Sequence, residues 1–344
     1  MTPRQAILDT IRHIQVAPVP YTIGFDGDLP AQLDKHYGGP HWRDRIKTYT
    51  HGSATCYTMK RWPVDGADPG LGRDIWGALW RSDGPTMRLV KPALPEPNLK
   101  NYRWPKPEDF FYTDEELAVD LASLEAHKDR FQIGYVIWGL FEQSWAMRGF
   151  ENILADIVAE EDFFVEMLDR ITDIYLALTE RTCRLLPVDA IMFADDWSDQ
   201  RGVIVGPDRW RKFYKPRWAK LYDCCRRHGK IVISHCCGSP ADIIGDAVEI
   251  GLNVLESVQP EPAGMNPYEL KRRWGKNLTF WGGLGAQSIL PFGTPAAIQA
   301  EVRRLRREMS RDGGYILAPA KNLQPGTPLK NAVAALEAFT EENA

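Results

Sequence analysis

The sequence has no apolar run close to the roughly 20 residues that a transmembrane helix needs. It opens with Met1-Thr2-Pro3-Arg4-Gln5, which lacks the apolar core of a secretory signal peptide. Its six cysteines include the adjacent pairs Cys224-Cys225 and Cys236-Cys237, an arrangement that suits a disulfide framework poorly. We therefore expect a soluble, cytoplasmic protein whose thiols are reduced.

The sequence also lacks an excess of charge of one sign. Its 42 Lys and Arg against 46 Asp and Glu give a net charge of -4. A mixed surface of this kind gives no electrostatic footprint for nucleic acid or for an anionic membrane. No Gly-x-Gly-x-x-Gly follows an early strand, so a dinucleotide-binding fold has no support. The expected partner is a small-molecule substrate, and the sequence leaves open whether the chain forms a homodimer.

What the chain does have is an alternation of short strand-like and longer helical patterns. The predicted strands are short, β-branched or aromatic, and bounded by Gly, Pro or Asp. They are Tyr21–Phe25, Ser53–Met59, Gln132–Trp138, Ala190–Ala194, Ile231–Ser234, Val254–Val258, Leu278–Gly282 and Tyr315–Ala318. Helical patterns lie at Glu161–Leu186, Pro207–His228, Asp246–Ile250 and Thr294–Met309. About eight strands with intervening helices favour an α/β fold, a single-domain (β/α)8 TIM-like barrel over residues 1–344.

The stretch Gly66–Pro107 departs from this alternation. It is rich in Pro, Gly and Trp and has little periodicity, which predicts an irregular N-terminal insertion or lid. The whole chain has twelve tryptophans, several of them in loops or polar company. Most are expected to be structural anchors, but their number favours an aromatic-lined pocket.

The most informative segment is Lys230–Pro240, where an apolar strand pattern ends in an imidazole, two thiols and a glycine. In barrels, ligands bind beyond the carboxyl ends of the strands. His235 and Cys237 lie two residues apart, on the same side of an extended chain, and such a pair can bind a soft metal. The alternative is a buried thiol pair beside a histidine bonded to a loop. Alternation puts Cys236 and Cys237 on opposite sides, and the sequence leaves open which one faces the site.

Acidic residues, a lysine and a glycine pair also lie at the ends of the neighbouring predicted strands. Each has an ordinary alternative, such as a helix cap, an arginine partner or a tight turn. Together they predict an active site at this face of the barrel. They are Asp195, Asp196, Glu256, Gly282, Gly283 and Lys321.

Several of these segments are similar to motifs of one known family. They are Phe193-Ala194-Asp195-Asp196-Trp197, Ser234-His235-Cys236-Cys237-Gly238, Trp281-Gly282-Gly283-Leu284-Gly285-Ala286-Gln287 and Gly313-Gly314-Tyr315-Ile316-Leu317-Ala318-Pro319. As a set they resemble the uroporphyrinogen decarboxylase superfamily over most of residues 130–340. Asp74-Ile75-Trp76-Gly77 and Thr327-Pro328-Leu329-Lys330-Asn331 fit its divergent bacterial branch, near the corrinoid-linked methyltransferases.

The resemblance implies one of two activities. True decarboxylases remove acetate carboxyls from a tetrapyrrole with an Arg-rich N-terminal segment and one pocket aspartate. This chain has no Arg-Gln-Ala-Gly-Arg near its start, and Trp145 stands where an aromatic hydroxyl is expected, which disfavours that activity. The other branch transfers methyl groups to or from a corrinoid and uses zinc in a His-x-Cys…Cys site.

The match to the zinc motif lacks its third cysteine. His235 and Cys237 take the first two positions, but no cysteine follows, and Lys321 stands near the expected third one. A zinc site would therefore recruit Glu256 or Asp195. Alternatively the metal is lost, Asp195 or Asp196 acts as a base, and Lys321 or His235 stabilises an anion.

The resulting hypothesis is a methyltransferase that demethylates a small methoxylated or methylated compound, with cobalamin or a corrinoid protein as methyl partner. His235, Cys237 and Glu256 would hold Zn²⁺, and Asp195, Asp196 and Lys321 would be catalytic. Trp197, Trp281, Gly282 and Gly283 would form the cofactor-binding wall. Because no Asp-x-His-x-x-Gly corrinoid signature occurs, the cobalamin would come from a partner protein or enter free.

Two alternatives remain open. One is a metal-free decarboxylase that recognises a carboxylate through arginines at the barrel mouth. The candidate arginines are Arg61, Arg81, Arg148 and Arg201. The other is a ligand-binding protein without catalysis.

Overall fold

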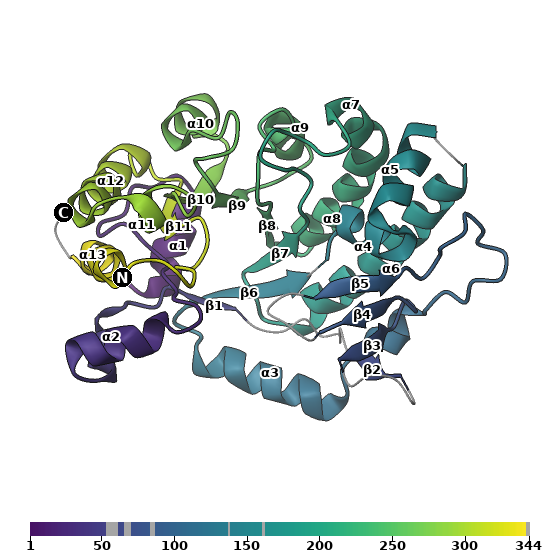
Figure 1. The fold of residues 1–344 in the computed structure, drawn as a ribbon, viewed down its shortest axis with the longest axis horizontal. Helices are drawn as coiled ribbons and strands as arrows, with labels where there is room; N and C mark the ends of the chain where they lie inside the picture. The colour runs from purple at the N-terminus through teal and green to yellow at the C-terminus, as the bar shows by residue number, and fades with distance from the viewer. Residues whose placement is uncertain (53–60, 65–69, 83–86, 137, 160–161, 342–344) are drawn as a thin grey trace.

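A parallel sheet of seven strands forms the centre of the computed structural model (Figure 1). The model describes residues 1–341 except 53–60, 65–69, 83–86, 137 and 160–161. The strands are β1 (Thr50–Gly52), β6 (Phe131–Val136), β7 (Ala190–Ala194), β8 (Ile231–His235), β9 (Val254–Val258), β10 (Thr279–Leu284) and β11 (Tyr315–Pro319). They lie in this order, and each neighbouring pair is parallel.

An eighth extended segment lies against β11. Isolated parallel bridges join Tyr21 to Leu317 and Phe25 to Leu323. The predicted strand Tyr21–Phe25 is therefore reduced to two bridges, because bends at 320–322 interrupt its partner. The predicted strand Ser53–Met59 lies outside the described residues. With these differences the prediction of an α/β, TIM-like (β/α)8 barrel is confirmed.

Helices surround the sheet (Figure 1). In the first half they are α1 (Pro3–Ile11), α2 (Leu29–Tyr37), α3 (Asp114–Ala126), α4 (Leu140–Arg148), α5 (Phe150–Ala159) and α6 (Asp162–Leu185). In the second half they are α7 (Pro207–Arg209), α8 (Lys215–Arg227), α9 (Ile244–Glu249), α10 (Pro267–Trp274), α11 (Ile289–Phe292), α12 (Pro295–Met309) and α13 (Leu329–Thr340). None of the described helices combines the length and the apolar character that crossing a membrane requires.

The predicted helices correspond closely to α6, α9, α12 and the α7–α8 segment. Thr294 caps α12, because its hydroxyl accepts a hydrogen bond from the backbone N–H of Ala297 at 3.2 Å. The predicted helix Pro207–His228 contains one irregularity. A π-helical turn at Trp210–Tyr214 separates α7 from α8.

The predicted insertion, Gly66–Pro107, contains regular structure as well as irregular segments. Four short antiparallel strands form a second sheet: β2 (Arg61–Pro63), β3 (Leu71–Asp74), β4 (Leu79–Arg81) and β5 (Arg88–Lys91). Figure 1 shows this sheet at the end of the molecule opposite α12 and α13. The ring of Trp80 on β4 packs edge-on against Trp138 and Trp145, at centroid distances of 4.9 and 5.9 Å. The aromatic contacts fix the insertion to α4 and the end of β6, while its action as a lid stays a prediction.

Candidate active site

Three predicted site residues meet at the carboxyl ends of β7 and β8. Ala194 pairs with His235 in the parallel register, so Asp196 and Cys237 both follow the strand ends closely. The Nε2 atom of His235 lies 3.1 Å from the Sγ of Cys237 and 4.0 Å from Oδ1 of Asp196. The three ligand atoms all lie within 4.8 Å of one another. We call Asp196, His235 and Cys237 the barrel triad.

The backbone holds the barrel triad together. The N–H of Cys237 donates to Oδ1 of Asp196 at 2.8 Å, which ties the loop after β8 to the loop after β7. Cys236 is fully buried, and its sulfur lies 3.1 Å from the hydroxyl of Ser198. The thiol that faces His235 is therefore that of Cys237, a point that the sequence left open.

Glu256 contacts His235 on the ring nitrogen that faces away from Cys237. It lies on β9 opposite His235 in the strand register, and its carboxylate contacts Nδ1 of the imidazole. Burial disfavours the imidazolium, but Glu256 and the Cys237 side chain outweigh it and raise the pKa of His235 to about 11. A carboxylate on one imidazole nitrogen orients the other toward a metal. Glu256 as a direct metal ligand stays a prediction, and the geometry offers Asp196 for that position.

If the barrel triad holds Zn²⁺, replacing Glu256 with glutamine is expected to weaken its binding by about 10–100-fold, the usual cost of losing a carboxylate that orients a ligating histidine. The ligands themselves are untouched, so metal stoichiometry at saturation should not change. Competition with a chromophoric chelator measures this affinity. An unchanged dissociation constant would show that Glu256 does not position His235.

Asp195 has a different role from Asp196. Its carboxylate is fully buried at the start of α4, where it accepts hydrogen bonds from the backbone N–H groups of Phe141 (3.0 Å) and Glu142 (2.9 Å). The indole N–H of Trp197 also donates to it at 2.9 Å. Burial raises the pKa of Asp195, and these three donors oppose that shift. Asp195 therefore joins β7 to the N-terminus of α4, and a catalytic role for it stays a prediction.

Gly139 makes the contact between Asp195 and α4 possible. A Cβ atom at this position would lie 2.3 Å from the Cβ of Asp195, a distance that real structures do not tolerate. The backbone N–H of Gly139 also donates to the carbonyl of Ala194 at 2.7 Å. Glycine is thus required where the chain passes from β6 into α4.

Glu142 is a site residue that the sequence reasoning missed. It is half-buried in the first turn of α4. Burial, together with the charges of Asp195 and Asp196, raises the pKa of Glu142 to about 8. Its position in the first turn of the helix that follows β6 was the signal that could have identified it.

Lys321 and Trp281 come together beside Glu256. All three line a cavity of about 170 Å³ beside β9, β10 and the carboxyl end of β11. The indole N–H of Trp281 donates to the hydroxyl of Thr22 at 2.8 Å, which holds the ring against the wall. Lys321, the predicted amine, and Trp281, a predicted cofactor-binding residue, therefore lie beside Glu256. Glu256 in turn contacts His235 of the barrel triad.

The other three predicted wall residues have structural explanations. Trp197 is buried and packs against Trp210 and Trp218. Gly282 has a φ of +132°, and a Cβ there would lie 2.6 Å from the backbone nitrogen of Val258. Gly283 has a φ of +101°, also outside the range that other residues adopt readily. Contact of these three residues with a cofactor stays a prediction.

Residues 133–342 match the family model described as uroporphyrinogen decarboxylase (URO-D). The chain belongs to the uroporphyrinogen decarboxylase family. A methyltransferase from Methanosarcina mazei is similar in structure, with a TM-score of 0.70, 19% identity and full coverage of both chains. At that identity the likeness shows the shared fold. No curated protein matches the chain.

Two further structures are more distant. A D-psicose 3-epimerase crystallised with D-fructose has a TM-score of 0.36 and 12% identity, over 66% of this chain and 82% of its own. The GH18 chitinase ChiB of Flavobacterium johnsoniae has a TM-score of 0.35 and 10% identity, over 68% of this chain and 83% of its own. At these TM-scores, neither structure bears on the function of this chain.

Proposed function

We propose that this uroporphyrinogen decarboxylase-family enzyme is a methyltransferase that demethylates a small methoxylated or methylated compound, with a corrinoid protein or cobalamin as the methyl partner. The observation that carries the proposal is the barrel triad, a carboxylate, an imidazole and a thiol whose ligand atoms lie within 4.8 Å of one another at the strand ends. The similar fold of a protein described as a methyltransferase supports it.

The barrel triad fits a zinc ion. Oxygen, nitrogen and sulfur donors are the ligands that Zn²⁺ takes in proteins, and three protein ligands leave a fourth position for substrate. Asp196, His235 and Cys237 would hold the ion, and Glu256 would fix the imidazole. When bound, zinc supplies a Lewis acid that stabilises the anionic form of a substrate oxygen or sulfur.

The chain's own residues then act on the substrate. During demethylation the bond between the methyl carbon and the substrate's heteroatom breaks. The heteroatom would keep the electron pair and take up a proton from solvent, and the methyl group would pass to the reduced corrinoid, the second substrate, whose own electron pair would form the new bond. Lys321, in the cavity shared with Glu256, can pair with an anionic substituent of the substrate. Trp281 offers an apolar wall in the same cavity.

The proposal is tested by incubating the zinc-loaded enzyme with cob(I)alamin and a panel of methoxylated and methylated donors. The visible spectrum separates cob(I)alamin from methylcobalamin, and mass spectrometry detects the demethylated product. We expect methyl transfer from at least one donor, lost after zinc is removed and restored by its return. Full activity of the metal-free enzyme would contradict a metal-activated site.

A metal-free decarboxylase is the second candidate. The observation that favours it is the grouping of Lys321 and Glu256 in one cavity, which can support acid–base chemistry without a metal. The predicted carboxylate-binding arginines add no support, because none of them is among the described residues that line this cavity. Arg148 is buried in an ion pair with Asp156 at 2.7 Å, whereas Arg201 is exposed, and the side chain of Arg61 lies outside the described part of the chain. Release of carbon dioxide from a carboxylated substrate by the metal-free enzyme would favour this alternative.

A further inference from the structure

A second group of soft metal-binding side chains lies outside the barrel, where α6 packs against α8. Glu180 and Cys183 are three residues apart on α6, and Cys224 and His228 are four residues apart at the end of α8. These spacings place each pair on one face of its helix. Glu180 on α6 therefore faces Cys224 and His228 on α8, and these three residues form a group separate from the barrel triad.

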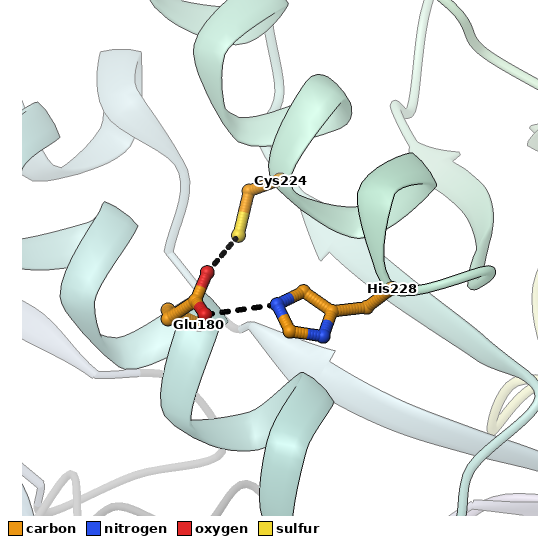
Figure 2. A group of neighbouring side chains, drawn as sticks. All are labelled: Glu180, Cys224 and His228. Carbon is orange, nitrogen blue, oxygen red and sulfur yellow. Dashed lines mark hydrogen bonds and ion pairs between the residues drawn. The ribbon is translucent and has the colours of Figure 1, made fainter.

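Figure 2 shows that both partners converge on the carboxylate of Glu180. Its Oε2 lies 3.3 Å from the sulfur of Cys224, and its Oε1 lies 2.9 Å from Nε2 of His228. The ligand atoms of these three residues all lie within 4.8 Å of one another. Around a tetrahedral zinc ion, ligand atoms are about 3.3–3.8 Å apart, given metal–ligand bonds of about 2.0–2.3 Å. Small side-chain movements would therefore admit an ion.

Burial and charge also suit a divalent cation. Cys224 is fully buried, whereas the side chains of Glu180 and His228 are 38% and 25% exposed, so an ion can enter from the solvent side. One thiolate and one carboxylate balance two positive charges, and a neutral imidazole adds a third donor.

We propose that Glu180, Cys224 and His228 bind a thiophilic divalent cation of the Zn²⁺ class, with a water molecule as the fourth ligand. Binding replaces the proton on Cys224 by the metal and releases that proton to solvent. The ion joins α6 to α8 on the outside of the barrel. It binds the folded chain and so stabilises it against unfolding. This site does not depend on the proposed methyl transfer.

The test uses the full-length His235→Ala/Cys237→Ser variant, in which the barrel triad cannot hold zinc. After chelation and desalting, Zn²⁺ is titrated against a chromophoric chelator, and Co²⁺ is used as a spectroscopic probe for thiolate coordination. We expect one zinc per chain, a cobalt–thiolate charge-transfer band and a zinc-dependent rise in Tm. Adding Cys224→Ser or His228→Gln should abolish all three.

Cys225→Ser in the same variant is the matched control, because Cys225 is the adjacent buried thiol and lies outside the group of ligand atoms within 4.8 Å. It should keep the zinc, the cobalt band and the Tm rise. Circular dichroism confirms that each variant is folded, and His228→Gln, at a partly exposed position, remains informative if Cys224→Ser unfolds. Two results would overturn the proposal: no bound zinc in the starting variant, or unchanged zinc affinity with His228→Gln.

Discussion

Asp195→Ala is expected to lower the free energy of unfolding by roughly 3–5 kcal/mol, because it leaves three buried N–H donors without an acceptor. Two of these donors are at the N-terminus of α4, where a carboxylate also stabilises the helix dipole. Urea denaturation followed by circular dichroism measures the change. Asp195→Asn should be milder, since its amide keeps one acceptor oxygen.

Asp196→Ala is the matched control for this prediction. Asp196 is the next residue, its side chain is 45% exposed, and it accepts a hydrogen bond from the N–H of Cys237. We expect its removal to change the free energy of unfolding by about 1 kcal/mol or less. Equal destabilisation by the two variants would contradict the separate roles of Asp195 and Asp196.

Cys237→Ser is expected to lower kcat/KM for methyl transfer by at least about 100-fold, a typical effect of removing a group that stabilises the transition state. The variant loses the sulfur that lies 3.1 Å from the imidazole of His235, and with it the soft ligand of the barrel triad. The cob(I)alamin assay measures the rate. The free energy of unfolding should change little, because Cys237 is partly exposed.

Cys236→Ser separates the loss of the metal ligand from a general effect of removing a thiol. Cys236 is adjacent and fully buried beside Ser198, and its sulfur is not one of the barrel triad's ligand atoms. We expect it to keep its zinc and most of its activity. If Cys236→Ser lost as much activity as Cys237→Ser, the assignment of the ligand would be wrong.

Local pattern was sufficient to predict the strands that position the site. Ala190–Ala194 and Val254–Val258 were predicted with the bounds that the structure shows. Each is a short segment with apolar residues at both ends and a polar residue on either side. The short strands of the insertion were missed. Each spans only three or four residues, and Gly and Pro within and around them hide any alternation.

The roles of neighbouring acidic residues could not be read from the sequence. Asp195 and Asp196 both follow β7, but the contact that distinguishes them is with Phe141 and Glu142, more than fifty positions earlier in the chain. Glu256 was predicted as a site residue, but its contact with Nδ1 of His235 depends on the register between β8 and β9. Tertiary contacts of this kind leave no periodic signal.

Metal binding by the barrel triad is tested by the zinc content of the full-length Cys224→Ser/His228→Gln variant, which lacks the outer ligands. It is measured after zinc addition and desalting, with and without His235→Ala or Cys237→Ser. We expect one zinc per chain in the starting variant and none after either further substitution. If the starting variant held no zinc, or if zinc stayed bound after either further substitution, the barrel triad would not be the metal site.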